Sequence, residues 1–205
     1  MIDLEYQTQR FKDHVATFTD YGKIKILDFQ KPGHNEYRIR FLFEEDFYRL
    51  HISGDLGELT ALNFRNMNYE NFGPDFINSP YYFEEKIRSH ERPIYTYDQD
   101  KARKDLKEML EEDELSLPSR YHFGTDDDDE AFEDFIDDVL EDFDDDQGIS
   151  HEGYRFLCEA DGNAWEYASR IGQERTGIIE LYLLAFRLAQ ENLKRQESEV
   201  IKNET

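Results

Sequence analysis

The sequence predicts an α+β protein in which a small antiparallel β-meander with helices precedes a helical C-terminal subregion bearing an acidic amphipathic helix. Three observations predict this class. Hydrophobic content of 38% and aromatic content of 15% are high enough for a folded chain, although the net charge is −24. Apolar and polar residues alternate over residues 22–64, as in half-buried strands. Helical periodicity dominates from residue 128 onward.

The first half of the chain is expected to contain one helix and then four strands. Residues 3–17 place Leu4, Phe11 and Val15 near one helical face, which predicts an amphipathic opening helix. The strands are expected in four alternating segments: GKIKILDF, EYRIRFLF, FYRLHISG and DLGELTALNF. Because the connections between these segments are too short for helical crossovers, the sheet should be antiparallel.

The strand pattern ends near residue 67, and helices are expected from there on. Short helices and loops should pack the aromatic residues that follow onto the sheet. A longer helix should begin at Asp98 or Asp100, because either residue can cap it. We therefore predict an α+β domain with an antiparallel sheet over residues 1–115, a linker over 116–127 and a helical subregion over 128–205.

The helical subregion is expected to contain helices over residues 128–143, 150–159, 162–171 and 176–195. The last of these is apolar nearly all round, which is typical of a helix at the centre of a core or in an oligomer interface. We favour the core. Trp165, near the start of the third helix, is expected to be buried.

Residues 126–146 form the most unusual segment, since they hold fourteen Asp and Glu residues and no Lys or Arg. Apolar residues within it follow helical spacing, namely Phe132, Phe135, Ile136, Val139, Leu140 and Phe143. Like charges four residues apart oppose this helix by about 1–2.5 kcal/mol, and the burial of its large apolar side chains can offset that penalty. We therefore expect a folded helix that docks through its apolar stripe.

The charges of this helix have nearly the linear spacing of nucleic acid. Seven acidic residues between Glu130 and Asp142 occupy about 18–20 Å, or one charge per roughly 2.7 Å of helix. Duplex DNA carries one charge per about 1.7 Å of axis, and a single strand carries one per about 3.4 Å. Two interpretations remain open. The helix is either a DNA-mimicking surface or a solvated face that keeps the protein soluble.

The DNA-mimic hypothesis assigns partner binding to the carboxylates of this segment. They are Asp126, Asp127, Asp128, Asp129, Glu130, Glu133, Asp134, Asp137, Asp138, Glu141, Asp142, Asp144, Asp145 and Asp146. Their expected contribution is to association rate and salt sensitivity, while shape and neighbouring apolar contacts supply specificity.

Composition restricts the partners and the compartment. A sequence pI near 4.5 disfavours direct binding to nucleic acid or to an anionic membrane and favours a basic protein as partner. Cys158 is the only cysteine, so no intrachain disulfide is expected. The N-terminal residues lack an apolar signal segment, and the longest apolar run is too short for a membrane span. We expect a cytoplasmic protein.

The sequence contains no recognisable motif for catalysis or for a cofactor. The patterns GxxxxGK[ST], GxGxxG, HExxH and GxSxG are absent, and the six histidines lack zinc-ligand spacing. A calcium-binding EF-hand loop that started at Asp142 would need glycine where Gln147 stands, so that site is rejected. We predict a protein that is not an enzyme, with no catalytic residues, no cofactor and no specific metal site. Weak divalent-cation binding by the aspartates and a hydrolase without a known motif stay open.

The segment IRFLFEEDFYRLHISGDLGELTALNFRNMNYENF resembles small acidic proteins carried by phages and mobile elements of Gram-positive bacteria. That setting includes anti-CRISPR inhibitors, some of which are acidic and occupy the nucleic-acid-binding surface of an RNA-guided DNA nuclease. The resemblance implies a basic partner of this kind. We therefore expect a non-enzymatic inhibitor that presents a DNA-mimicking surface to such a nuclease. The alternative is an acidic adaptor or chaperone for another basic protein.

Overall fold

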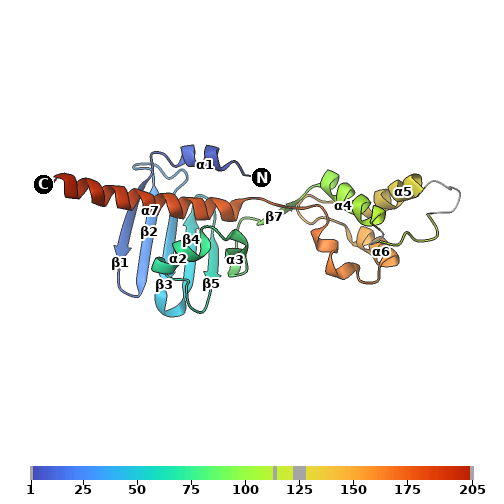
Figure 1. Cartoon of the computed structure of the whole chain (residues 1–205), viewed down its shortest axis with the longest axis horizontal. Coiled ribbons are helices and arrows are strands. Elements are labelled where there is room, and N and C mark those ends of the chain that lie inside the picture. Colours follow the sequence, from blue (N-terminus) through green and yellow to red (C-terminus); the bar gives the residue numbers. More distant parts are fainter. Residues whose placement is uncertain (1, 113–114, 122–127, 204–205) are drawn as a thin grey trace. The chain divides into compact units, whose positions relative to one another are not determined.

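The computed structural model describes residues 2–112, 115–121 and 128–203, and it confirms the predicted α+β class (Figure 1). The chain forms two compact units. Unit 1 consists of Met1–Ile94 and Gly177–Thr205, and unit 2 consists of Tyr95–Thr176. Unit 2 is therefore an insertion within the sequence of unit 1.

Unit 1 contains a six-stranded antiparallel meander in the order β1-β2-β3-β4-β5-β6. Its strands are β1 (Val15–Asp20), β2 (Ile24–Gln30), β3 (Ile39–Glu44), β4 (Arg49–Gly54), β5 (Leu59–Leu62) and β6 (Ile87–His90). The predicted alternation is present in the register. Leu27, Phe41 and Ile52 lie opposite one another on adjacent strands and are buried on the same face.

Helices cover one face of this sheet (Figure 1). α7 crosses the strands, and the ring of Phe186 lies 4.7 Å from that of Phe72 and 5.2 Å from that of Phe41. The expected place of this helix in a core is confirmed. No described helix, α7 included, is long and apolar enough to span a bilayer. The helices of unit 1 are α1 (Leu4–Arg10), the 3-10 helix η1 (Glu45–Phe47), α2 (Tyr69–Phe76), α3 (Pro80–Glu84) and α7 (Ile178–Asn203).

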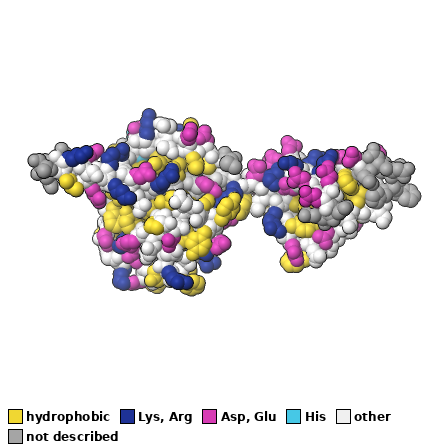
Figure 2. Space-filling model, in the orientation of Figure 1, with side chains coloured by type: hydrophobic (Ala, Val, Ile, Leu, Met, Phe, Trp, Pro, Cys, Tyr) yellow, Lys and Arg dark blue, Asp and Glu magenta, His cyan; other side chains and the backbone are white. Residues whose placement is uncertain are grey.

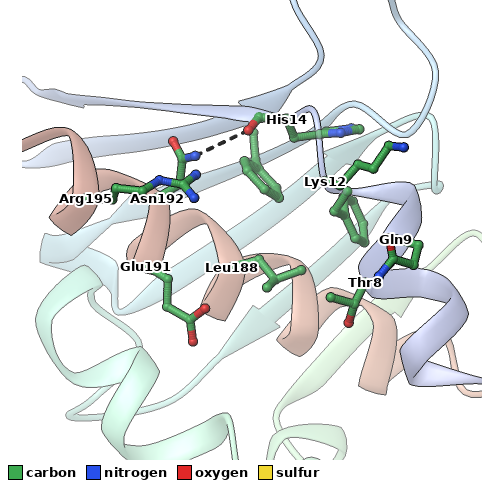
Figure 3. A pocket seen from close by; sticks show the side chains of 10 residues that line it. Thr8, Gln9, Lys12, His14, Leu188, Glu191, Asn192 and Arg195 are labelled. Atoms are coloured by element: carbon green, nitrogen blue, oxygen red, sulfur yellow. Dashed lines mark hydrogen bonds between the residues drawn. The ribbon is translucent and has the colours of Figure 1, made fainter.

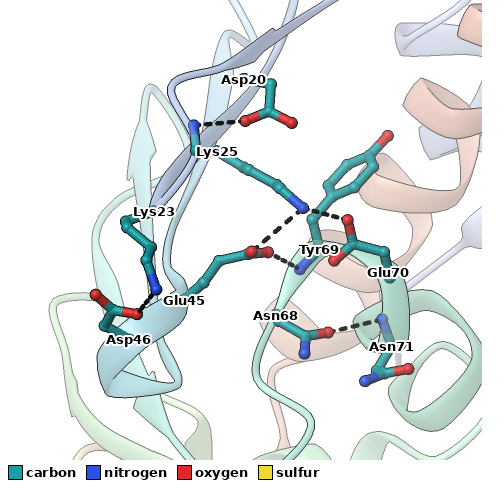
Figure 4. A network of polar contacts seen from close by, with 10 residues as sticks. Asp20, Lys23, Lys25, Glu45, Asp46, Asn68, Tyr69, Glu70 and Asn71 are labelled. Carbon is teal, nitrogen blue, oxygen red and sulfur yellow. Dashed lines mark hydrogen bonds and ion pairs between the residues drawn. The ribbon is translucent and has the colours of Figure 1, made fainter.

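A polar network fastens α2 and the β3–β4 connection to β2 (Figure 4). Lys25, which is nearly buried on β2, pairs with Glu70 on α2 and, at 3.2 Å, with Glu45. Glu45 also accepts a hydrogen bond from the backbone N–H of Tyr69. Asn68 caps α2 by accepting from a backbone N–H in its first turn. The buried ammonium of Lys25 is thus compensated by two carboxylates, as a buried charge requires.

The predicted opening helix over residues 3–17 is wrong in its second half. α1 is capped by Asp3 and ends at Arg10, and Val15 already begins β1. Val15 fitted a helical face in the sequence, but pairing with β2 over six residues and hydrogen bonds from α7 outweigh that local pattern. Ala16 donates to the side chain of Asn192 on α7, which closes this edge of the sheet at that residue.

Unit 2 is mainly helical, and a short two-stranded sheet pairs its first and last residues. Its elements are β7 (Tyr95–Tyr97), α4 (Gln99–Glu111), α5 (Asp128–Leu140), α6 (His151–Ala160), the 3-10 helices η2 (Ala164–Glu166) and η3 (Ala168–Arg170), and β8 (Gln173–Arg175). The side chain of Asp98 accepts from the N–H of Lys101 and caps α4, so the first of the two predicted start residues is correct.

Two further expectations for unit 2 are wrong. The helix expected over 162–171 is replaced by η2 and η3, because Tyr167, with a φ of −133°, interrupts the helical path between them. Trp165, expected to be buried, has 66% of its surface exposed. The small residue Ala164 is buried in its place, so the ring of the neighbouring Trp165 projects outward.

The compact units also divide the chain differently from the predicted domains over 1–115 and 128–205, with a linker over 116–127. α4 buries Ala102 and Leu106 against the core of unit 2, although it was assigned to the first domain. α7 buries its apolar surface on the sheet of unit 1, although it was assigned to the helical subregion. Within the predicted linker, Leu117 and Tyr121 pack on the core of unit 2, and residues 122–127 lie outside the described part.

Candidate protein-interaction surface

The apolar stripe of α5 is the anchor of the acidic segment. Phe135, Ile136 and Val139 are fully buried and pack in a core built with α4 and α6. α6 approaches α5 closely because Gly153 has no side chain. A Cβ atom there would lie 2.0 Å from the carbonyl oxygen of Val139. The expected docking of the acidic helix through this stripe is therefore present in the structure.

The predicted partner-binding carboxylates occupy different positions around this anchor. Asp126 and Asp127 lie outside the described residues, and Asp128 is the first residue of α5. Asp129 and Glu130 follow in the exposed first turn of the helix. Of the remaining nine, three are paired with α4 or Tyr121, and the other six are exposed, four of them in a turn after α5.

α4 neutralises part of the acidic face. Arg103 pairs with Glu133 at 2.8 Å and also with Asp137, and Lys107 lies 3.3 Å from Glu133. The carboxylates, Asp137 first, raise the pKa of the Arg103 guanidinium. Sequence reasoning missed these pairs. The available signal was the spacing of Arg103 and Lys107, which puts two cations on one face of α4.

A second partner of the acidic face comes from the predicted linker. The hydroxyl of Tyr121 donates to Asp138 at 2.7 Å, and Arg120 donates to the same hydroxyl at 2.8 Å. Burial, with a smaller contribution from Asp138, raises the pKa of Tyr121 to about 12. The ring of Tyr121 contacts Phe135 edge-on, so this residue connects the buried stripe to the polar side of α5.

The aspartates after α5 belong to a tight turn. Asp142 has a φ of 59°, in the left-handed region that Asp tolerates better than most residues, and this conformation stops the helix. Asp144 accepts from the N–H groups of Asp146 and Gln147. The carbonyl of Asp145 accepts from Tyr97 N–H and from the Thr96 hydroxyl, which leaves its side chain exposed.

Five of the predicted carboxylates are exposed, and their side chains form neither an ion pair nor a hydrogen bond within the part of the chain that the structure describes. We call these residues the acidic patch, and they are Asp134, Glu141, Asp142, Asp145 and Asp146. Asp134 lies on α5, and Glu141 follows the last residue of that helix, with Asp138 between them in the sequence. Figure 2 shows acidic and basic side chains interspersed on unit 2, in agreement with the pairing by α4.

Negative charge is concentrated in unit 2. Tyr95–Thr176 contains 27 Asp and Glu residues against 8 Lys and Arg residues, which gives −19 of the total of −24. Unit 1 carries 21 acidic and 16 basic residues, or −5. The long-range field of the protein therefore originates mainly in the inserted unit.

Metal binding has no structural support in the described ranges. Among these residues no three His, Cys, Asp or Glu side chains lie close enough together to hold a metal ion. The only cysteine, Cys158, is partly exposed and unpaired. The weak divalent binding considered from the sequence remains a prediction.

Comparisons with protein families, with curated proteins and with solved structures give no match for this chain. The function is therefore inferred from the surface of the molecule.

Proposed function

We propose that this protein binds a basic, nucleic-acid-handling protein through the acidic patch and thereby blocks the nucleic-acid site of that partner. One observation carries the proposal: α5 is anchored by a fully buried apolar stripe, while Asp134 on the helix and Glu141 just after it are exposed without ion pairs. A merely solvated acidic tract needs no such anchor. A rigid negative surface suits a groove that evolved to bind phosphates.

The pairs with α4 change how the mimicry works. Glu133 and Asp137 are bound to Arg103, and Asp138 accepts a hydrogen bond from Tyr121. On α5 and directly after it, the exposed carboxylates that form no ion pair among the described residues are Asp134 and Glu141. They are about 10 Å apart along the helix axis, which is wider than the roughly 3.4 Å between phosphates of one strand. The patch thus resembles nucleic acid in the sign and concentration of its charge, and does not match it phosphate for phosphate.

The most specific partner that we propose is an RNA-guided DNA nuclease. Such an enzyme holds its guide–target duplex in a positively charged channel and recognises the backbone of that duplex. The segment over residues 39–72 resembles proteins from a setting where inhibitors of these nucleases occur. The net charge of −19 on unit 2 would speed association with that channel and make binding sensitive to salt.

The test reverses the charge of the unpaired carboxylates. Asp134→Lys with Glu141→Lys leaves the pairs of Arg103 untouched, so we expect unit 2 to stay folded. The matched control is Glu197→Lys with Glu199→Lys, which makes the same charge change on exposed positions of α7. Binding to a guide-loaded nuclease is measured by surface plasmon resonance from 50 to 500 mM NaCl. Association of the first variant should slow at least tenfold, and that of the control by less than twofold.

Competition with target DNA tests whether the protein occupies the nucleic-acid site of the partner. If the proposal is right, DNA added before the protein prevents binding, and binding weakens steeply with salt. Equal binding by the Asp134 and Glu141 double variant and the wild type would remove the acidic patch from the interface. Binding to a basic protein that leaves its nucleic-acid site open would favour an adaptor or chaperone instead.

A further inference from the structure

Unit 1 contains a cavity of about 290 Å³ beside the last turn of α1 (Figure 3). It lies among α1, the residues that follow α1, β2 and α7. Its apolar wall includes Phe11, Phe29 and Leu188. This volume is near the lower end of pockets that hold small organic ligands. The cavity is thus large enough for a small molecule and too small for a folded partner.

Two cations line this cavity without a carboxylate partner. Lys12 and Arg195 are both exposed, and neither forms an ion pair among the described residues. Arg10 next to the cavity, by contrast, is paired with Glu36. Glu191, the one acidic residue lining the cavity, lies 4.0 Å from Arg187 outside it. The lining therefore offers positive charge to a ligand.

His14 adds a buried aromatic ring to the same wall. Only 4% of the residue is exposed, and its ring packs on Phe11 and Phe29 at 5.1 Å. Nε2 donates to the carbonyl of Tyr37 at 3.2 Å, since a carbonyl can only accept. Nδ1 has no hydrogen-bond partner in the described structure. Nδ1 is itself inaccessible to solvent, so His14 forms a rigid part of the cavity wall and not a donor to an anion.

We propose that this cavity binds a small organic anion, whose phosphate or carboxylate faces Lys12 and Arg195 and whose apolar body lies against Phe11 and Leu188. The charge of the lining selects the anionic group. The aromatic and aliphatic wall selects an apolar body, because burying it in this cleft removes apolar surface from water. The site lies entirely in unit 1 and does not depend on the function proposed for the acidic patch.

The experiment titrates the full-length protein with three probes and follows binding by calorimetry and by NMR of the His14 ring. The probes are phenyl phosphate, phenylacetate and inorganic phosphate. We expect saturable binding of one molecule per chain for at least one aromatic anion, with inorganic phosphate at least tenfold weaker. Preference for phenyl phosphate identifies a phosphate ligand, and preference for phenylacetate identifies a carboxylate.

Charge-matched variants make the test specific. Lys12→Gln and Arg195→Gln should each weaken binding about tenfold, because each removes one charged donor. Lys194→Gln removes the same charge from the residue beside Arg195, outside the cavity lining, and should change the affinity by less than twofold. All three positions are exposed, so we expect the variants to fold. The proposal would be overturned if neither aromatic anion showed saturable binding, or if inorganic phosphate bound as tightly as they do. It would also be overturned if Lys194→Gln weakened binding as much as the other two substitutions.

Discussion

Single buried polar groups connect the elements of each unit, and Tyr182 is the clearest case in unit 1. Only 1% of Tyr182 is exposed, and its hydroxyl donates to the carbonyl of Leu56 at 2.8 Å. The bond joins α7 to the connection between β4 and β5. Burial raises the pKa of Tyr182 to about 12.

The hydrogen bond of Tyr182 should contribute measurably to the stability of unit 1. Tyr182→Phe leaves the carbonyl of Leu56 without this donor, so the free energy of unfolding at pH 7 should fall by about 1–2 kcal/mol. Tyr21→Phe is the control, because Tyr21 is 70% exposed, and its effect should stay within about 0.5 kcal/mol. Urea unfolding followed by circular dichroism measures both. Equal effects of the two substitutions would contradict the assigned role.

The same tyrosine predicts a loss of stability at alkaline pH. In the unfolded chain a tyrosine has a pKa of about 10, whereas the folded pKa of Tyr182 is about 12, so folding favours the neutral form. This contribution is fully present below pH 10 and is lost as the pH rises toward 12. Between these pH values the wild type should therefore lose more stability than Tyr182→Phe. Parallel pH profiles of the two proteins would show that Tyr182 does not titrate in this way.

At the scale of elements, local patterns predicted α4, α5 and strands β2 to β5, because each carries its own periodicity and its own cap or turn. They did not predict β1, whose Val15 fitted a helix equally well and whose pairing with β2 is a tertiary effect. The candidate site shows the same limit. The density of carboxylates was visible in the sequence, but Arg103 neutralises Glu133 from thirty residues away, and only packing brings them together.

Arg103 should therefore stabilise the pairing of α4 with α5. Arg103→Met removes the cation that pairs with both Glu133 and Asp137. These two carboxylates are four residues apart, so they would then repel each other. The loss of this network should lower the free energy of unfolding of unit 2 by about 1 kcal/mol at low salt. Lys104→Met is the matched control, since Lys104 forms only an exposed pair within α4 at 3.5 Å and should cost about 0.3 kcal/mol. Urea unfolding in 20 mM salt separates the two values. The prediction fails if the control is as unstable as Arg103→Met.

At the scale of the whole molecule, the chain separates a nearly balanced unit 1 from a strongly acidic unit 2. The insertion of Tyr95–Thr176 was not predictable from periodicity. An apolar face indicates that a helix is buried, but it does not indicate which element packs against that face. Once the bounds of the units are known, the charge difference between them follows directly from the sequence. Repulsion among the carboxylates should destabilise unit 2, whose net charge is −19. The net charge of −5 on unit 1 should have little such effect.

Salt should therefore stabilise the two units unequally. Raising NaCl from 20 to 500 mM shortens the screening length from roughly 20 Å to about 4 Å, which suppresses repulsion between carboxylates that are not in contact. The contacts of Arg103 are also screened, but they involve few charges compared with the excess on unit 2. Hydrogen exchange followed by mass spectrometry should show slower exchange in α4 and α5 at high salt and a smaller change in β3 and β4. Faster exchange in α5 at high salt would mean that its ion pairs outweigh its self-repulsion, and the acidic patch would then hold less uncompensated charge than its composition indicates.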